Sequence, residues 1–100
     1  MKLKLQTQGF TASNELTKLL YKKVARLTQL PEKITAAEVK LSCDESGSNE
    51  NKVCNIRLAV PGNDLLANVK SKTFEDAIAD AVEVLKRKIE KRKTRIDILK

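Results

Sequence analysis

Apolar and polar residues follow two different periods along the chain, and these periods predict strands in some segments and helices in others. Apolar side chains recur at three- and four-residue steps in residues 14–29 and 73–95, a pattern typical of helices with one buried face. Strict alternation, typical of strands with one buried face, occurs in residues 2–7, 37–43, 54–60 and 65–70. The predicted order of elements is therefore β-α-β-β-β-α.

Capping and breaking residues mark the ends of both predicted helices. Ser13 is the predicted N-cap of the first helix, and Pro31 ends that helix because proline has no backbone N–H to donate. Thr73 is the predicted N-cap of the second helix, where Asp76 places a favourable negative charge in the first turn. The predicted buried faces consist of Leu16, Leu19, Leu20, Val24 and Leu27 in the first helix, and Phe74, Ile78, Ala81, Val82, Leu85, Ile89 and Ile96 in the second.

The fold class predicted from this order is α+β, with a single domain spanning residues 1–100. The 41% hydrophobic content suffices for one modest core. Residues 44–52 contain almost no apolar side chains and are predicted to form a hairpin loop, and residues 61–64 (PGND) are a strong turn signal. We expect a four-stranded sheet with both helices packed on one face, and a parallel pairing of the first two strands across the first helix.

Positive charge is concentrated on the two predicted helices, in a chain whose formal net charge is +7. Cations in the last turns of a helix are ordinary, since they complement the helix dipole and are solvated. The excess over acidic residues is nevertheless larger than solubility needs, and such a field attracts polyanions. If the helices lie side by side, their cations form a continuous positive groove. The candidate RNA-binding residues are Lys18, Lys22, Lys23, Arg26, Lys86, Arg87, Lys88, Lys91, Arg92, Lys93 and Arg95.

The residues that most enzymes need are missing from the sequence. There is no histidine, so the usual general base near neutral pH is absent, and two cysteines alone do not make a zinc site. Cys43 and Cys54 are expected to point inward on adjacent strands as small buried residues, although a redox pair stays open. We therefore predict no catalytic activity, no metal, no cofactor and no small-molecule substrate.

Hydropathy and aromatic content narrow the possible partners further. No apolar run approaches the ~20 residues that span a membrane, and the N-terminus lacks a secretory h-region, so we expect a cytoplasmic protein. Phe10, Tyr21 and Phe74 are the only aromatic residues, and Phe74 belongs to the predicted core. Tyr21 fits a core margin better than a base-stacking position. Structured RNA bound through its backbone is therefore favoured over a stacked single strand.

Several short motifs resemble those of one known family. They are Lys23-x-x-Arg26-Leu27 in the first helix, Pro61-Gly62-Asn63 in the turn, and Ala77-Ile78 followed by Leu85-x-Arg87-x-Ile89-x-Lys91-x-Lys93 in the second helix. On these residues the chain resembles, over nearly its whole length, the ribosome hibernation promoting factor family, also called ribosome-associated inhibitors or sigma-54 modulation proteins. Where the family has an acidic-hydrophobic-tyrosine triplet, this chain has Thr73-Phe74-Glu75, and Val84 stands in place of a common lysine.

The resemblance implies a specific function. Members of the family bind the small ribosomal subunit in the channel for messenger and transfer RNA, where helix cations contact ribosomal RNA phosphates, and so inhibit translation in idle or stressed cells. Lys23, Arg26, Arg87, Lys91 and Lys93 match the family's helix patterns. Because the chain ends at Lys100, it resembles a short form without the C-terminal domain that pairs ribosomes. The alternative is a basic interaction module for an acidic protein partner such as a transcription factor; the oligomeric state stays open.

Overall fold

The computed structural model describes residues 2–29, 34–44 and 50–99, except for the side chains of residues 28, 29 and 92–99. The order of elements is β-α-β-β-β-α, as predicted from the sequence. The elements are β1 (Lys2–Gln8), α1 (Asn14–Ala25), the 3-10 helix η1 (Arg26–Gln29), β2 (Ala36–Cys43), β3 (Lys52–Ala59), β4 (Leu65–Ser71) and α2 (Phe74–Leu99).

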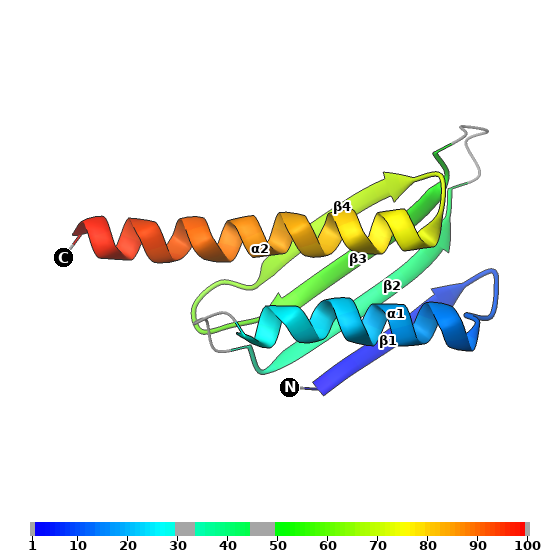
Figure 1. Cartoon of the computed structure of the whole chain (residues 1–100), viewed down its shortest axis with the longest axis horizontal. Helices are drawn as coiled ribbons and strands as arrows, with labels where there is room; N and C mark the ends of the chain where they lie inside the picture. Colours follow the sequence, from blue (N-terminus) through cyan, green and yellow to red (C-terminus); the bar gives the residue numbers. More distant parts are fainter. Residues whose placement is uncertain (1, 30–33, 45–49, 100) are drawn as a thin grey trace.

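The four strands form one mixed sheet in the order β1-β2-β3-β4. β1 pairs with β2 in parallel, which confirms the prediction, and the other two pairings are antiparallel. Both helices lie on the same face of the sheet (Figure 1). β1 and β4 point the same way, and each is followed by a helix that runs back across the sheet. α1 and α2 therefore run side by side in the same direction (Figure 1).

The core lies between this face of the sheet and the two helices. Among the described residues, every buried side chain is apolar. The alternating positions of β2 and β3 and most of the predicted apolar positions of α1 and α2 meet there. Leu19, predicted to be buried, is half-buried, and the side chain of Ile96 lies outside the described part. The largest of the fully buried side chains are Leu20, Val24, Leu27, Val39, Leu41, Cys54, Ile56, Leu58, Ile78, Leu85 and Ile89. Neither helix combines the length and hydropathy needed to cross a membrane, within the part of the chain that the structure describes.

Both predicted N-caps are present. The Ser13 hydroxyl accepts a hydrogen bond from the backbone N–H of Leu16 at 3.1 Å, and the Thr73 hydroxyl accepts one from that of Asp76 at 3.1 Å. Each cap satisfies a backbone donor that has no partner within the helix. Gly62 has a φ of 89°, a left-handed conformation that glycine adopts without a steric cost, and this confirms the turn predicted at residues 61–64.

The first helix differs from its predicted form at its C-terminal end. The pattern predicted one α-helix over residues 14–29, but the α-helix ends at Ala25 and continues as η1. The tighter 3-10 winding is common in the last turn of a helix. It keeps Leu27 in the core, where it is 1% exposed. The second helix is longer than predicted and ends at Leu99 instead of Arg95.

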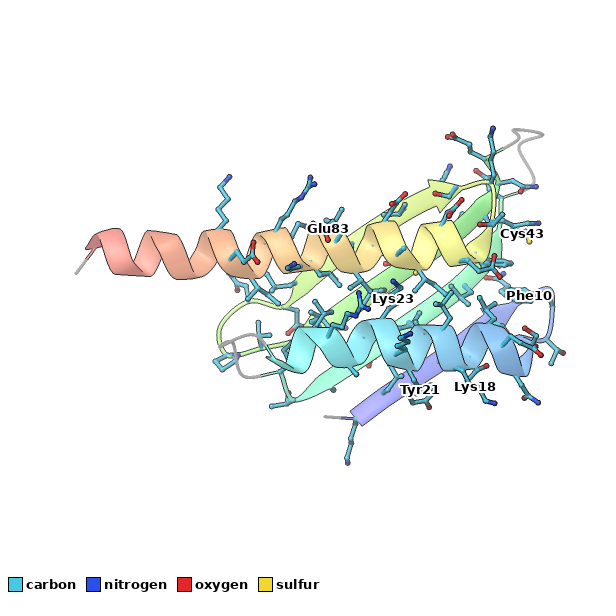
Figure 2. All side chains as sticks on the ribbon, in the orientation of Figure 1. Phe10, Lys18, Tyr21, Lys23, Cys43 and Glu83 are labelled. Atoms are coloured by element: carbon cyan, nitrogen blue, oxygen red, sulfur yellow. The ribbon has the colours of Figure 1, made fainter. Side chains whose placement is uncertain are left out.

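The two cysteines have different surroundings, and the prediction that both are buried is wrong for Cys43. Cys54 is fully buried in β3, and burial raises the pKa of its thiol to about 12. Cys43 lies on the same face as Leu41 but is exposed, because it is the last residue of β2 and lies beyond the start of α2 (Figure 2). Both thiols are free. The hairpin predicted at residues 44–52 is closed by a 2.7 Å bond from the Asp44 N–H to the Asn51 carbonyl; residues 45–49 lie outside the described part.

Candidate nucleic-acid interface

A groove runs between α1 and α2 on the outer surface of the helical layer, with a volume of about 490 Å³. Leu27 and Val82, both buried, form its apolar base. Three cations lie on this one concave surface: Lys23 from α1, Arg26 from η1 and Lys86 from α2. The residues that line the groove are Lys23, Arg26 and Leu27 from α1 and η1, and Ala79, Val82, Glu83 and Lys86 from α2.

The cations of this groove have no acidic partner among the side chains that the structure describes. Among the described side chains, no ion pair involves Lys23, Arg26 or Lys86. Arg26 and Lys86 are exposed and Lys23 is half-buried, so their charged ends remain in water. Solvated cations that converge on a groove can neutralise the phosphates of a polyanion without recognising a sequence.

The other predicted cations of the first helix do not all face this groove. Lys18 and Tyr21 lie on the side of α1 that is turned away from α2, whereas Lys23 lies between the helices (Figure 2). Lys18, Lys22 and Arg26 follow one another at four-residue steps, and each step advances about 40° around the helix. The ridge therefore winds from the β1 side to the groove. Lys18 and Lys22 therefore do not line the groove, and the whole ridge does not join it as expected.

The cations of α2 also separate into different surroundings. Lys86 lines the groove, while Arg87 and Lys91 are exposed on the outer surface of the helix. The Lys88 ammonium donates a hydrogen bond to the backbone carbonyl of Leu66 in β4 at 2.5 Å, so it lies over the edge of the sheet. The last turns of α2 project past the sheet (Figure 1). They carry the predicted residues Arg92, Lys93 and Arg95, whose side chains lie outside the described part.

Sequence reasoning missed the one acidic residue that lines the groove, Glu83. Its carboxylate lies 3.5 Å from the Arg87 guanidinium, one helical turn further along α2. The available signal was the four-residue spacing of these opposite charges, which stabilises isolated helices. The same spacing cannot show that Glu83 also faces α1, because that depends on how the two helices are oriented.

Charge is separated along both helices. Glu15 lies in the first turn of α1, and every charged residue of α2 before Lys86 is acidic. Cations follow toward the C-terminal ends, which lie at the same end of the molecule because the helices run in the same direction (Figure 1). Lys22 and Lys23, in the last turn of α1, complement the negative end of that helix dipole. The acidic residues of α2 that precede Lys86 are Glu75, Asp76, Asp80 and Glu83.

The opposite, helix-free face of the sheet has a shallow hollow of about 380 Å³. Its cations are interleaved with acids. In the strand register Glu38 lies between Lys4 and Arg57, and the Asp64 carboxylate is 2.6 Å from Arg57. The hydrogen bond to Asp64, and then the charges of Asp64 and Glu38, raise the pKa of Arg57 above its ordinary value. The hollow is lined by Lys4, Gln6, Glu38, Val39, Lys40, Asn55, Arg57 and Leu66.

The aromatic residues do not form a stacking platform in the groove. Phe10 and Phe74 stack on each other with ring centroids 4.5 Å apart, and the Lys52 ammonium lies 5.7 Å from the Phe74 ring. Both Phe side chains are partly buried against the core. Tyr21 is half exposed on the side of α1 away from the groove (Figure 2). No group of three potential metal-binding side chains occurs among the residues described.

Comparisons with known proteins agree with this fold. A family model described as "Sigma 54 modulation protein / S30EA ribosomal protein" matches residues 3–97. The chain therefore belongs to this family, which confirms the resemblance found in the helix and turn motifs. Among curated proteins, none matches the sequence.

Two solved structures share the fold. A ribosomal subunit interface protein from Coxiella burnetii superposes with a TM-score of 0.80 at 18% identity, over 94% of this chain and 99% of that one. The N-terminal domain of Protein Y from Thermus thermophilus superposes with a TM-score of 0.76 at 22% identity, over 91% of this chain and 98% of that one. At these identities the likeness concerns the fold alone.

Proposed function

We propose that the protein binds the small ribosomal subunit through phosphate contacts made from the groove between α1 and α2, in the channel for messenger and transfer RNA, and thereby inhibits translation. The observation that carries this proposal is the convergence of Lys23, Arg26 and Lys86, without acidic partners among the described side chains, on one groove. Family membership supports the ribosome as the source of the polyanion. The Coxiella burnetii relative is itself called a ribosomal subunit interface protein.

The chemistry of the groove favours a structured RNA backbone as its ligand. Lysine and arginine neutralise phosphates without reading bases, and the groove has no aromatic side chain on which a base could stack. Recognition of folded RNA by the shape of its backbone fits these properties. Lys91, Arg92, Lys93 and Arg95 extend the proposed contact along α2 toward its C-terminal end.

The decisive experiment measures co-sedimentation of the protein with purified small ribosomal subunits over a salt series. If the three groove cations each neutralise a phosphate, affinity should fall roughly 20- to 40-fold between 50 and 200 mM salt. Messenger RNA together with transfer RNA should displace the protein, and added protein should lower the yield of a cell-free translation reaction. Large subunits serve as the control.

The same experiment separates the ribosomal proposal from the alternative, in which the groove binds an acidic protein. The words "Sigma 54 modulation protein" in the family description are the reason to test this alternative. An absence of binding to small subunits at low salt would contradict the ribosomal proposal. Binding that messenger and transfer RNA leave unchanged would contradict the proposed channel and would place the contact elsewhere on the subunit.

A further inference from the structure

The groove contains one carboxylate among its cations, and this arrangement bears on how tightly it can hold a polyanion. Glu83 lines the groove together with Lys23, Arg26 and Lys86. Its side chain is 52% exposed and, among the described side chains, is paired only with Arg87, whose side chain is 77% exposed. Figure 2 shows Glu83 on α2 and Lys23 on the neighbouring helix, on the side that faces α2.

We propose that Glu83 limits the affinity of the groove for phosphate and that Arg87 acts as a positioning residue that holds the Glu83 carboxylate away from the bound anion. The inference rests on the proposed function, since it concerns the ligand of that same groove. It adds an affinity-setting pair that charge composition alone does not predict, because Arg87 then acts through Glu83 and not through a contact of its own.

The physical argument starts from the position of the carboxylate. A negative charge that lines the same concave surface as three cations opposes an incoming phosphate by the Coulomb interaction through which the cations attract it. The pairing of Glu83 with Arg87 offsets part of this repulsion. The pair is exposed and its N–O distance is 3.5 Å, so it is weak and rearranges readily. The Glu83 carboxylate therefore repels a bound phosphate, and its pairing with Arg87 reduces this repulsion.

An ordinary surface pair at four-residue spacing makes a different prediction. Such a pair stabilises a helix slightly and has no effect on a ligand. If Glu83 and Arg87 do nothing more, replacing either residue changes the unfolding free energy slightly and leaves the binding affinity of Glu83→Gln at the wild-type value. Binding measurements therefore separate the two explanations.

The test is a double-mutant cycle with four proteins: wild type, Glu83→Gln, Arg87→Gln and the double variant. Binding to purified small ribosomal subunits is measured at one fixed salt concentration. Removal of the Glu83 charge should tighten binding about three- to tenfold. Arg87→Gln should weaken binding about three- to tenfold in the wild-type background but less than about twofold in the Glu83→Gln background, because the carboxylate that it restrains is gone.

Glu75→Gln is the matched control, because Glu75 is an exposed glutamate of the first turn of the same helix and does not line the groove. We expect its affinity to stay within about twofold of the wild type. Equal effects of Glu83→Gln and Glu75→Gln would overturn the role of Glu83. An equal cost of Arg87→Gln in both backgrounds would show that Arg87 contacts the ligand directly, which overturns its positioning role.

A second probe separates failure of this inference from failure of the proposed function. The cycle is repeated with a duplex RNA in place of the subunit. If wild type binds the duplex but not the subunit, the ribosomal proposal fails, and the duplex cycle still decides the roles of Glu83 and Arg87. If wild type binds neither probe, both proposals are overturned. Thermal unfolding of all four proteins verifies that each variant is folded.

Discussion

Cations occur both in the groove between α1 and α2 and on the open face of the sheet, but the acids around them are placed differently. On the open face, Glu38 lies between Lys4 and Arg57 in neighbouring strands, and Asp64 is bonded to Arg57. In the groove, three cations converge with Glu83 alone, and Glu83 is paired with Arg87 on the outer side of α2.

This difference shows why the count of basic residues is a poor guide to a binding site. Charges of opposite sign that alternate across a sheet stabilise one another and cancel at a short distance from the surface. Charges of one sign gathered in a concave surface reinforce one another and extend their field into solvent. The groove, not the hollow on the sheet, is therefore the surface that should attract a polyanion.

The largest expected effect comes from reversing two charges in the groove, compared with reversing two charges on the open face of the sheet. Arg26→Glu with Lys86→Glu should weaken binding to small ribosomal subunits about 100-fold or more, since two phosphate contacts become repulsions. Lys4→Glu with Lys40→Glu changes the net charge by the same amount and should weaken binding by less than about threefold. Co-sedimentation at one salt concentration measures both. Equal losses in the two variants would show that only net charge matters and that the groove has no special role.

A smaller effect is expected if the interleaving on the sheet is broken. Glu38→Gln removes the acid that lies between Lys4 and Arg57, and so leaves the open face more basic. Its affinity for a duplex RNA should rise about two- to threefold, because the cations of this face are no longer offset. Filter binding measures the change, with Glu50→Gln as a control that alters the same charge outside the hollow. An unchanged affinity would mean that Glu38 does not weaken the attraction of the open face for RNA.

The smallest expected effect concerns Lys88, a cation of α2 that lies away from the groove. Lys88→Ala removes the hydrogen bond to the Leu66 carbonyl and should lower the free energy of unfolding by about 0.5–1 kcal/mol. Its binding to small subunits should change less than about twofold. Lys91→Ala should leave stability unchanged, since Lys91 is exposed and makes no such bond in the described part of the chain. Urea unfolding and co-sedimentation test both variants. A binding loss in Lys88→Ala as large as that of Lys86→Ala would refute the distinction between the two positions.

Much of the fold could be predicted because its determinants are local. The alternation in β2 and β3, the apolar faces of the helices, and the caps at Ser13 and Thr73 are each properties of a short segment, and the structure confirms them. Cys43 shows the limit of this reasoning. Its place in the alternation predicts burial, but burial also requires a second element that covers the side chain. Cys43 lies beyond the start of α2 and is therefore left exposed.

The candidate site was less predictable, because it depends on the relation between two helices. Periodicity placed Lys23, Arg26 and Lys86 outside the core, but only the packing of α1 beside α2 brings them to one groove. The same packing turns Lys18 away and brings Glu83 to the groove, and the sheet edge engages Lys88. Each of these outcomes depends on how a helix is rotated about its own axis relative to its neighbours. The pattern of residues within one helix does not specify that rotation.

The shared direction of the two helices has a consequence for how the protein meets a charged partner. With acids at the start of both helices and cations toward their ends, the side-chain charges give the molecule a permanent electric dipole along the long axis of α2, with its positive end toward the C-terminal end of that helix. The two helix backbones, each equivalent to only about half a charge at either end, point in the opposite sense and offset this dipole in part. In the field of a polyanion such a dipole experiences a torque before any contact forms. The protein should therefore arrive with the C-terminal end of α2 leading, so that fewer collisions are lost to wrong orientations.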